Sequence, residues 1–184
     1  MKKNNIGNYI ATEHLRDQRP LTIRAIRPED RGLVTDALRD VNAESLYLRF
    51  FSPKTKFTDE DLKQATEVDF VNVVALVALR DEDGHDRIVG GGRYIRTGTS
   101  GAGQRAEVAF LIDDAHQGLG IGSRIFKHLV TIARASGITQ FEAEVLPGNR
   151  AMLALFSRSG LPMKRQLEEG AVHVTLSLSA PAPG

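Results

Sequence analysis

A glycine-rich turn between a strand-like run and a helical run is the feature that most constrains this chain. Residues 106–112 are rich in apolar and strand-forming side chains, and residues 117–122 then read Gln-Gly-Leu-Gly-Ile-Gly. Glycine lets a backbone turn tightly and bring its N–H groups close to a bound group. A helix that begins at Gly122 adds unsatisfied N–H donors and the positive end of its dipole. The order of strand, glycine turn and helix is therefore typical of a site for a phosphate or pyrophosphate.

Two other phosphate-binding turns fit this stretch poorly. The Rossmann turn needs Gly-x-Gly-x-x-Gly, but the residue three positions after Gly120 is Ser123. The P-loop ends in Gly-Lys-Ser/Thr, but Gly122 is followed by Ser123 and Arg124. A nucleotide-binding domain is therefore disfavoured, and a glycine-rich turn without a ligand remains the plain alternative.

The remaining sequence predicts one mixed α/β (α+β) domain over residues 21–179, between an N-terminal arm (1–20) and a flexible C-terminal tail (180–184). The expected strands are 21–26, 70–79, 87–96, 104–112, 140–145, 161–167 and 171–178. Helices are expected from about 28, 44, 58, 122 and 149. The turn-forming residues at 81–86 predict a hairpin between the second and third strands.

Composition removes several classes of function. The formal net charge of +1 provides no overall field for nucleic acid or a membrane surface. The chain has no cysteine, which excludes disulfides, thiolate metal sites and an acetyl-cysteine intermediate. Its five histidines have no ligand spacing, so no metal is expected. The apolar run at 71–79 is too short to cross a bilayer, and we expect a soluble, cytoplasmic protein.

The motif Gln117-x-x-Gly120-x-Gly122 resembles the pyrophosphate loop of the GCN5-related N-acetyltransferase (GNAT) superfamily. The flanking stretches 106–110, 149–152 and 156–161 agree with that superfamily in the same order. Residues 44–51 are also similar to the acetyltransferase domains of bacterial Pat-type protein lysine acetyltransferases. The resemblance implies a mixed, mostly antiparallel sheet of six to seven strands with about four flanking helices. That sheet is splayed between its fourth and fifth strands, here 104–112 and 140–145.

The resemblance implies a site for acetyl-CoA as co-substrate. Loop amides hold the pyrophosphate, the end of the fourth strand offers main-chain groups to the pantetheine arm, and Asn149 both caps its helix and hydrogen-bonds that arm. The cofactor-binding residues expected on this basis are Phe110, Leu111, Ile112, Gln117, Gly118, Leu119, Gly120, Ile121, Gly122, Ser123 and Asn149. Arg124 either lies near the phosphates or on the solvated face of its helix.

Direct transfer to an amine requires a base, because a protonated amine is no nucleophile. Glu107 matches the superfamily's frequent glutamate base, and its alternative role is that of an ordinary strand glutamate that faces solvent or pairs with an arginine. The superfamily often protonates the leaving thiolate with a tyrosine seven positions after the asparagine, but Phe156 stands there. Tyr47 and Tyr94 are the candidate replacements, and water is the alternative.

The expected function is transfer of an acetyl group from acetyl-CoA to a primary amine in a ternary complex. A protein lysine is the first expected acceptor, and a polyamine, amino acid or aminoglycoside is the alternative. Phe156 also leaves open a non-catalytic, acyl-CoA-binding regulatory module. The expected partners are acetyl-CoA and the amine, with a second copy of the chain as a further candidate and without nucleic acid or membrane.

Overall fold

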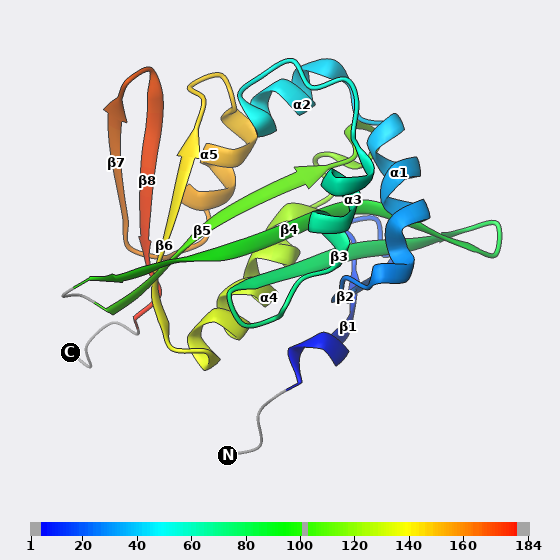
Figure 1. Ribbon diagram of the computed structural model, residues 1–184, viewed down its shortest axis with the longest axis horizontal. Helices are drawn as coiled ribbons and strands as arrows, with labels where there is room; N and C mark the ends of the chain where they lie inside the picture. The colour runs from blue at the N-terminus through cyan, green and yellow to red at the C-terminus, as the bar shows by residue number, and fades with distance from the viewer. Residues whose placement is uncertain (1–4, 101–102, 180–184) are drawn as a thin grey trace.

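One eight-stranded sheet with helices on both faces forms the computed structural model, which describes residues 5–100 and 103–179 (Figure 1). The strands are β1 (Ile10–His14), β2 (Pro20–Ala25), β3 (Val73–Glu82), β4 (His85–Ser100), β5 (Gly103–Ile112), β6 (Ile138–Val145), β7 (Met163–Glu168) and β8 (Ala171–Ser177). The α-helices are α1 (Arg31–Arg39), α2 (Ala43–Phe50), α3 (Asp59–Thr66), α4 (Ile121–Ala135) and α5 (Arg150–Ser157). Three short 3-10 helices are η1 (Ile6–Asn8), η2 (Pro28–Asp30) and η3 (Asp114–His116).

The strand order is β1-β2-β3-β4-β5-β6-β8-β7, and every neighbouring pair is antiparallel except β5 and β6. The expected mixed α/β class with a mostly antiparallel sheet is therefore confirmed. The number of strands differs from the six or seven expected, because β1 adds an edge strand from the predicted arm. Five α-helices, rather than about four, occur in the described residues.

Strands β5 and β6 pair over only part of their lengths. Paired residues run from Gln104 with Ile138 to Glu107 with Glu142. Beyond this point β5 continues to Ile112 without pairing to β6, whereas β6 stays paired with β8 up to Val145. Figure 1 shows the two strands diverging towards their C-terminal ends. The backbone groups of β5 on that side have no strand partner, so the splay leaves them available to a ligand.

Part of the predicted N-terminal arm is built into the sheet. Residues Ile6–Asn8 form η1, and β1 pairs antiparallel with β2. Leu15, just after β1, is 1% exposed and belongs to the main core. The predicted C-terminal tail, 180–184, lies outside the described residues.

The sheet separates two hydrophobic clusters. The larger one packs α4 and α5 against one face, and the smaller one packs α1 against the other. Strand β3 serves both, because Val74 and Leu76 point into the larger cluster while Ala75 and Val77 point into the smaller one. Such a strand reads as a continuous apolar run because both of its faces are buried.

Local signals set several boundaries as predicted. Thr58 and Asp61 form the capping box of α3, with reciprocal side-chain to backbone hydrogen bonds of 3.1 and 2.9 Å. Asp83 and Gly84 have φ values of 55° and 81° and close the predicted hairpin between β3 and β4. Helix α4 begins one residue earlier than expected, at Ile121. Across the described residues, none of the helices combines the length and the apolar character needed to span a bilayer.

Candidate active site

The glycine turn forms the floor of a cleft at the N-terminus of α4. Gly118 and Gly120 have φ values of 80° and 84°, a conformation that favours glycine. Gly120 is the N-cap of α4 and provides no side-chain cap to the helix amides. A Cβ at Gly122 would lie 2.8 Å from Cδ1 of Leu155, so α4 and α5 approach each other closely there. The turn therefore presents bare N–H donors and the positive end of the helix dipole to the cleft.

The cleft encloses about 280 Å³ and brings together most of the sequence-predicted cofactor residues. Those that line it are Phe110, Leu111, Ile112, Gln117, Gly118, Gly120, Ile121, Gly122, Ser123 and Asn149. Leu119 does not line the cleft, because it packs against the main core instead. Asn149 caps α5 by accepting a 3.2 Å hydrogen bond from the N–H of Met152, and the donor side of its amide is a separate group.

Arginine side chains surround the turn, and the sequence reasoning missed two of them. Arg16, from the segment after β1, lines the cleft and donates a 3.2 Å hydrogen bond to the carbonyl of Gly118. Arg158, from the end of α5, also lines the cleft. Arg124 donates a 3.0 Å hydrogen bond to the carbonyl of Gly120, so it braces the turn and does not line the cleft. Only the pairing of β1 with β2 brings Arg16 to the turn, and no local pattern signals it.

Two aspartates fix the segment between β5 and the turn. Buried Asp113 accepts 2.9 Å hydrogen bonds from Arg87 and from Nδ1 of His116. Asp114 accepts 2.6 and 2.7 Å hydrogen bonds from the N–H of Asn42 and the hydroxyl of Ser45, at the start of α2. Gln117 donates to Asp114 at 3.0 Å. Asp114 therefore joins the glycine turn to α2.

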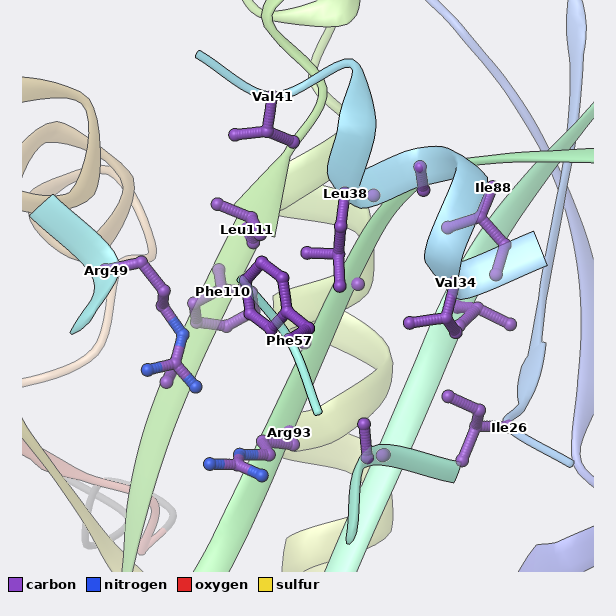
Figure 2. Close-up of a pocket in the computed structure, with 18 of the residues that line it drawn as sticks. Ile26, Val34, Leu38, Val41, Arg49, Phe57, Ile88, Arg93, Phe110 and Leu111 are labelled. Carbon is purple, nitrogen blue, oxygen red and sulfur yellow. The ribbon is translucent and has the colours of Figure 1, made fainter. Parts of the chain in front are cut away.

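A second cavity of about 250 Å³ lies on the α1 face of the sheet, between α1, α2, α3 and strands β3 to β5 (Figure 2). Its lining is mainly apolar, and Figure 2 labels Ile26, Val34, Leu38, Val41, Phe57, Ile88, Phe110 and Leu111 together with Arg49 and Arg93. Arg49, Phe110 and Leu111 line both cavities. The two cavities therefore meet at the C-terminal end of β5.

Glu107 stands at the point where β5 and β6 part. It is the last β5 residue paired with β6, and its side chain is exposed. Its neighbours on the same strand face are Ala109 and Leu111, which line the second cavity. Glu142, directly opposite on β6, is held by Arg105 in a 3.0 Å ion pair, whereas no ion pair engages Glu107 within the described residues. Glu107 therefore lines neither cavity and lies on the same strand face as two residues that line the second one.

The tyrosines do not reach the meeting point of the cavities. Phe156 is 0% exposed and packs edge-to-face with Phe110 and Phe126. Tyr94 is also 0% exposed, on the opposite sheet face from Arg93, and burial raises its pKa. Tyr47 is an exposed residue of α2. Among the described residues, no tyrosine lines either cavity.

Comparison with known proteins places this arrangement in a family. The family model described as Acetyltransferase (GNAT) family matches residues 36–161. Acetyltransferase PA5475 of Pseudomonas aeruginosa is 31% identical over 157 residues, which cover 85% of this chain and 83% of that protein. Acetyltransferase Pat of Mycolicibacterium smegmatis is 31% identical over 144 residues, 78% of this chain, but the match spans only 42% of that protein.

Among solved structures, the GNAT domain of S. lividans PAT superposes with a TM-score of 0.82 at 36% identity, over 91% of this chain and 96% of that one. The sequence match, the shared architecture and the split between β5 and β6 agree. The chain therefore belongs to the GNAT acetyltransferase family and is an acyltransferase.

Proposed function

We propose that this protein transfers the acetyl group of acetyl-CoA to a primary amine by direct attack in a ternary complex. The observation that carries the proposal is the meeting of two cavities at the end of β5, where Phe110 and Leu111 line both. One cavity has the amide donors of a glycine turn, and the other is apolar with a cationic end. Donor and acceptor could thus reach one reaction centre from opposite sides.

On this proposal the first cavity holds the co-substrate. The turn amides and the N-terminus of α4 receive the pyrophosphate, with Arg16 and Arg158 as further cationic groups. The unpaired side of β5 at 110–112 hydrogen-bonds the amides of the pantetheine arm, which takes the place of the missing strand partner. Asn149 contributes its side-chain amide to the same arm.

Glu107 is the proposed base. It removes a proton from the ammonium, directly or through one water, and the amine nitrogen then attacks the thioester carbonyl carbon. A carbon–nitrogen bond forms and the carbon–sulfur bond breaks, so coenzyme A leaves as a thiolate. Formation of the neutral amide releases a second proton from the nitrogen. Because the described residues place no tyrosine in either cavity, water carries this proton to the thiolate.

A protein lysine is the proposed first acceptor. Residues 44–51 resemble the Pat-type protein lysine acetyltransferases, and two similar proteins carry the name Pat. A small-molecule amine is the enzymatic alternative. We also propose a cytoplasmic location, a homodimer, and a division of the chain into an N-terminal arm, one domain and a C-terminal tail.

A non-catalytic acyl-CoA-binding module, the alternative that the sequence left open, conflicts with the acyltransferase assignment, and the observation in its favour is buried Phe156 in place of a tyrosine. Calorimetric titration with acetyl-CoA, followed by thiol release against a panel of amines and lysine-containing proteins, separates the candidates. Binding with amine-dependent release supports the transferase. Binding without release for any amine supports the module, and the absence of binding contradicts both.

A further inference from the structure

Two arginines bring their guanidinium groups to the same end of the second cavity, which on our proposal receives the acceptor amine. Arg49 comes from α2 and Arg93 from β4, and Figure 2 shows both side chains reaching towards the space beside β5. Arg49 also lines the cofactor cleft. The pair therefore faces the place where an acceptor amine would meet the thioester.

The other charged groups of the cavity lining are already paired. Lys54 contacts Asp61 at 3.2 Å, and Asp113 contacts Arg87 at 2.9 Å. In residues 5–100 and 103–179, by contrast, neither Arg49 nor Arg93 forms a hydrogen bond or an ion pair, although Arg49 lies 4.9 Å over the Phe50 ring. The ten N–H donors of these two guanidinium groups thus have no protein acceptor within the described residues, and both side chains line the cavity.

Glu107 compensates the positive charges of Arg49 and Arg93 only in part. Burial lowers the pKa of Arg49 to about 10, with the neighbouring charge of Arg93 acting in the same direction and Glu107 opposing it. Burial also lowers the pKa of Arg93, again against Glu107. Both arginines remain protonated at neutral pH, so two cations stand beside one carboxylate. Partly desolvated cations without a bonded anion are costly, and an incoming anion would remove that cost.

The strand register sets the distance between this cationic pair and the proposed base. Arg93 pairs with Ala109, and the next residue pair on that face is Ile95 with Glu107. Arg93 and Glu107 are therefore diagonal neighbours, a relation that spans roughly 7–8 Å between backbones. An acceptor could place its ammonium at Glu107 and an anionic group a few bonds away at the arginines.

We propose that the acceptor carries a carboxylate or phosphate close to its reacting amine, and that Arg49 and Arg93 bind this anion. The guanidinium fork suits the two or three oxygens of such groups, and two forks together favour them over a neutral substituent. The inference rests on the proposed acetyltransferase function and narrows its acceptor class. For a protein substrate, the anion is an acidic side chain beside the lysine.

Matched acceptors test the proposal with the whole 184-residue chain. The peptides acetyl-Glu-Lys-Glu-amide and acetyl-Gln-Lys-Gln-amide differ in charge but share one lysine, and β-alanine, β-alaninamide and 2-aminoethyl phosphate form the small-molecule series. We expect kcat/KM to favour the anionic member by about 10- to 100-fold, as for a charge-assisted hydrogen bond. The series with the larger preference identifies the source of the anion. Equal rates, or a preference for the neutral acceptor, would overturn the inference.

Single substitutions test whether Arg49 and Arg93 cause the preference for anionic acceptors. Arg93→Gln and Arg49→Gln should each reduce the ratio of anionic to neutral kcat/KM by about tenfold. Arg39→Gln removes the same charge from an exposed site on α1 and should keep the wild-type ratio. Thermal unfolding and acetyl-CoA affinity are measured for each variant, because Arg49 also lines the cofactor cleft. An unchanged ratio in both cavity variants would contradict the assignment.

Direct binding separates this inference from the proposed function. Calorimetry with coenzyme A-saturated protein compares the same acidic and amide ligands and needs no turnover. If no acceptor is acetylated, the transferase proposal fails, and tighter binding of the acidic ligands still supports the anion site. If acetylation proceeds but acidic ligands bind no better than their amides, the anion site fails alone.

Discussion

At the scale of single residues, our proposals assign the chemistry to Glu107 and to the arginines around the two cavities. Glu107 is exposed at the split between β5 and β6, whereas the opposite carboxylate of Glu142 is held by Arg105. Of the two carboxylates in this strand pair, Glu142 is held in an ion pair, whereas Glu107 has none within the described part of the chain. A proton acceptor must be able to change its protonation state and contact its substrate, so the free group is the better candidate.

Replacing Glu107, the proposed base, should slow acetyl transfer without affecting acetyl-CoA binding. We expect Glu107→Gln to reduce kcat/KM for the amine by about 100-fold or more at neutral pH. The residual rate should rise with pH towards the amine pKa, about 10.4 for lysine, because only the unprotonated amine then reacts. Thiol-release kinetics across pH and acetyl-CoA calorimetry measure both effects. Glu142→Gln is the matched control, and a similar loss in that variant would argue against a specific role for Glu107.

Arg16 should contribute to the phosphate end of the cofactor cleft. We expect Arg16→Gln to weaken acetyl-CoA binding by about fivefold, as an exposed cation near phosphates contributes modestly. The effect should disappear with acetyl-pantetheine, which lacks the phosphates, and shrink at high salt. Arg19→Gln removes an arginine of the same segment that is ion-paired with Asp17. Equal weakening for both cofactors would place Arg16 away from the phosphates.

At the scale of the elements, close contact between β4 and α4 fixes the position of α4, and with it the glycine turn, against the sheet. A Cβ at Gly92 would lie 2.7 Å from both Cγ2 of Ile125 and Cδ1 of Phe110. These atoms belong to a buried branched side chain and an aromatic ring, which cannot move aside easily. The absence of a side chain on β4 therefore allows α4, and with it the glycine turn, to lie close to the sheet.

A methyl group at this contact should destabilise the protein. We expect Gly92→Ala to lower the free energy of unfolding by about 1–3 kcal/mol through overpacking. Gly32→Ala on the exposed side of α1 meets no atom within 4 Å and should instead raise stability by up to about 1 kcal/mol through helix propensity. Urea unfolding measures the free energy of unfolding of both variants. A stable Gly92→Ala protein would show that β4 and α4 can separate at little cost.

Asp69 stabilises the loop that leads into β3 and should make the free energy of unfolding depend on pH in the acid range. Hydrogen bonds from the backbone N–H groups of Val73 and Val71 lower its pKa to about 2. A folded-state pKa below the unfolded value means that this stabilisation is present above about pH 4 and is lost as pH falls towards 2. Asp69→Asn should therefore be less stable than wild type at pH 7, with a difference that vanishes near pH 2.

Thermal unfolding of wild type and Asp69→Asn between pH 7 and 2 measures this convergence. Asp36→Asn replaces an exposed carboxylate on α1 and serves as the control. A constant difference between Asp69→Asn and wild type across this range would indicate that packing, rather than ionisation, causes the loss.

On the scale of the whole molecule, strand β1 links the edge of the sheet to the cleft at the glycine turn. Tyr9 and Glu13 both hydrogen-bond His128 of α4, and Leu15 is buried in the main core. Arg16 then reaches the glycine turn. The predicted arm thus connects an edge of the sheet, α4 and the cleft, which lie far apart in the sequence.

Removing this segment should affect both stability and cofactor binding. Deletion of residues 1–16 removes β1 and the buried Leu15 side chain, whose burial alone contributes roughly 2 kcal/mol. We expect a lower melting temperature and weaker acetyl-CoA binding than in Arg16→Gln. Leu15→Ala separates the packing loss from the charge loss, because it keeps Arg16. Wild-type behaviour of the truncated protein would show that the arm acts independently of the domain.

The sequence by itself determined the features that depend on neighbouring residues. The glycine turn, the Thr58–Asp61 capping box and the Asp83-Gly84 hairpin turn follow from local backbone preferences, and they appear as predicted. The residues at 110–112 and 117–123, which we expect to bind the cofactor, lie within one continuous stretch. Their shared cleft could therefore be predicted, with Leu119 as the exception because the packing of α4 turns it to the core.

Only the tertiary structure decided which distant residues meet. The partners of β1, the point at which β5 and β6 part, and the approach of Arg16 to the turn all depend on strand pairing between remote segments. Arg49 and Arg93 are 44 positions apart in the sequence and line the same cavity only because α2 packs against β5, the neighbour of β4 in the sheet. Local propensity acts over a few residues, whereas burial and electrostatic contact act through space. The fold and the glycine turn could thus be predicted from the sequence, whereas the proposed acceptor site depends on the packing of distant segments.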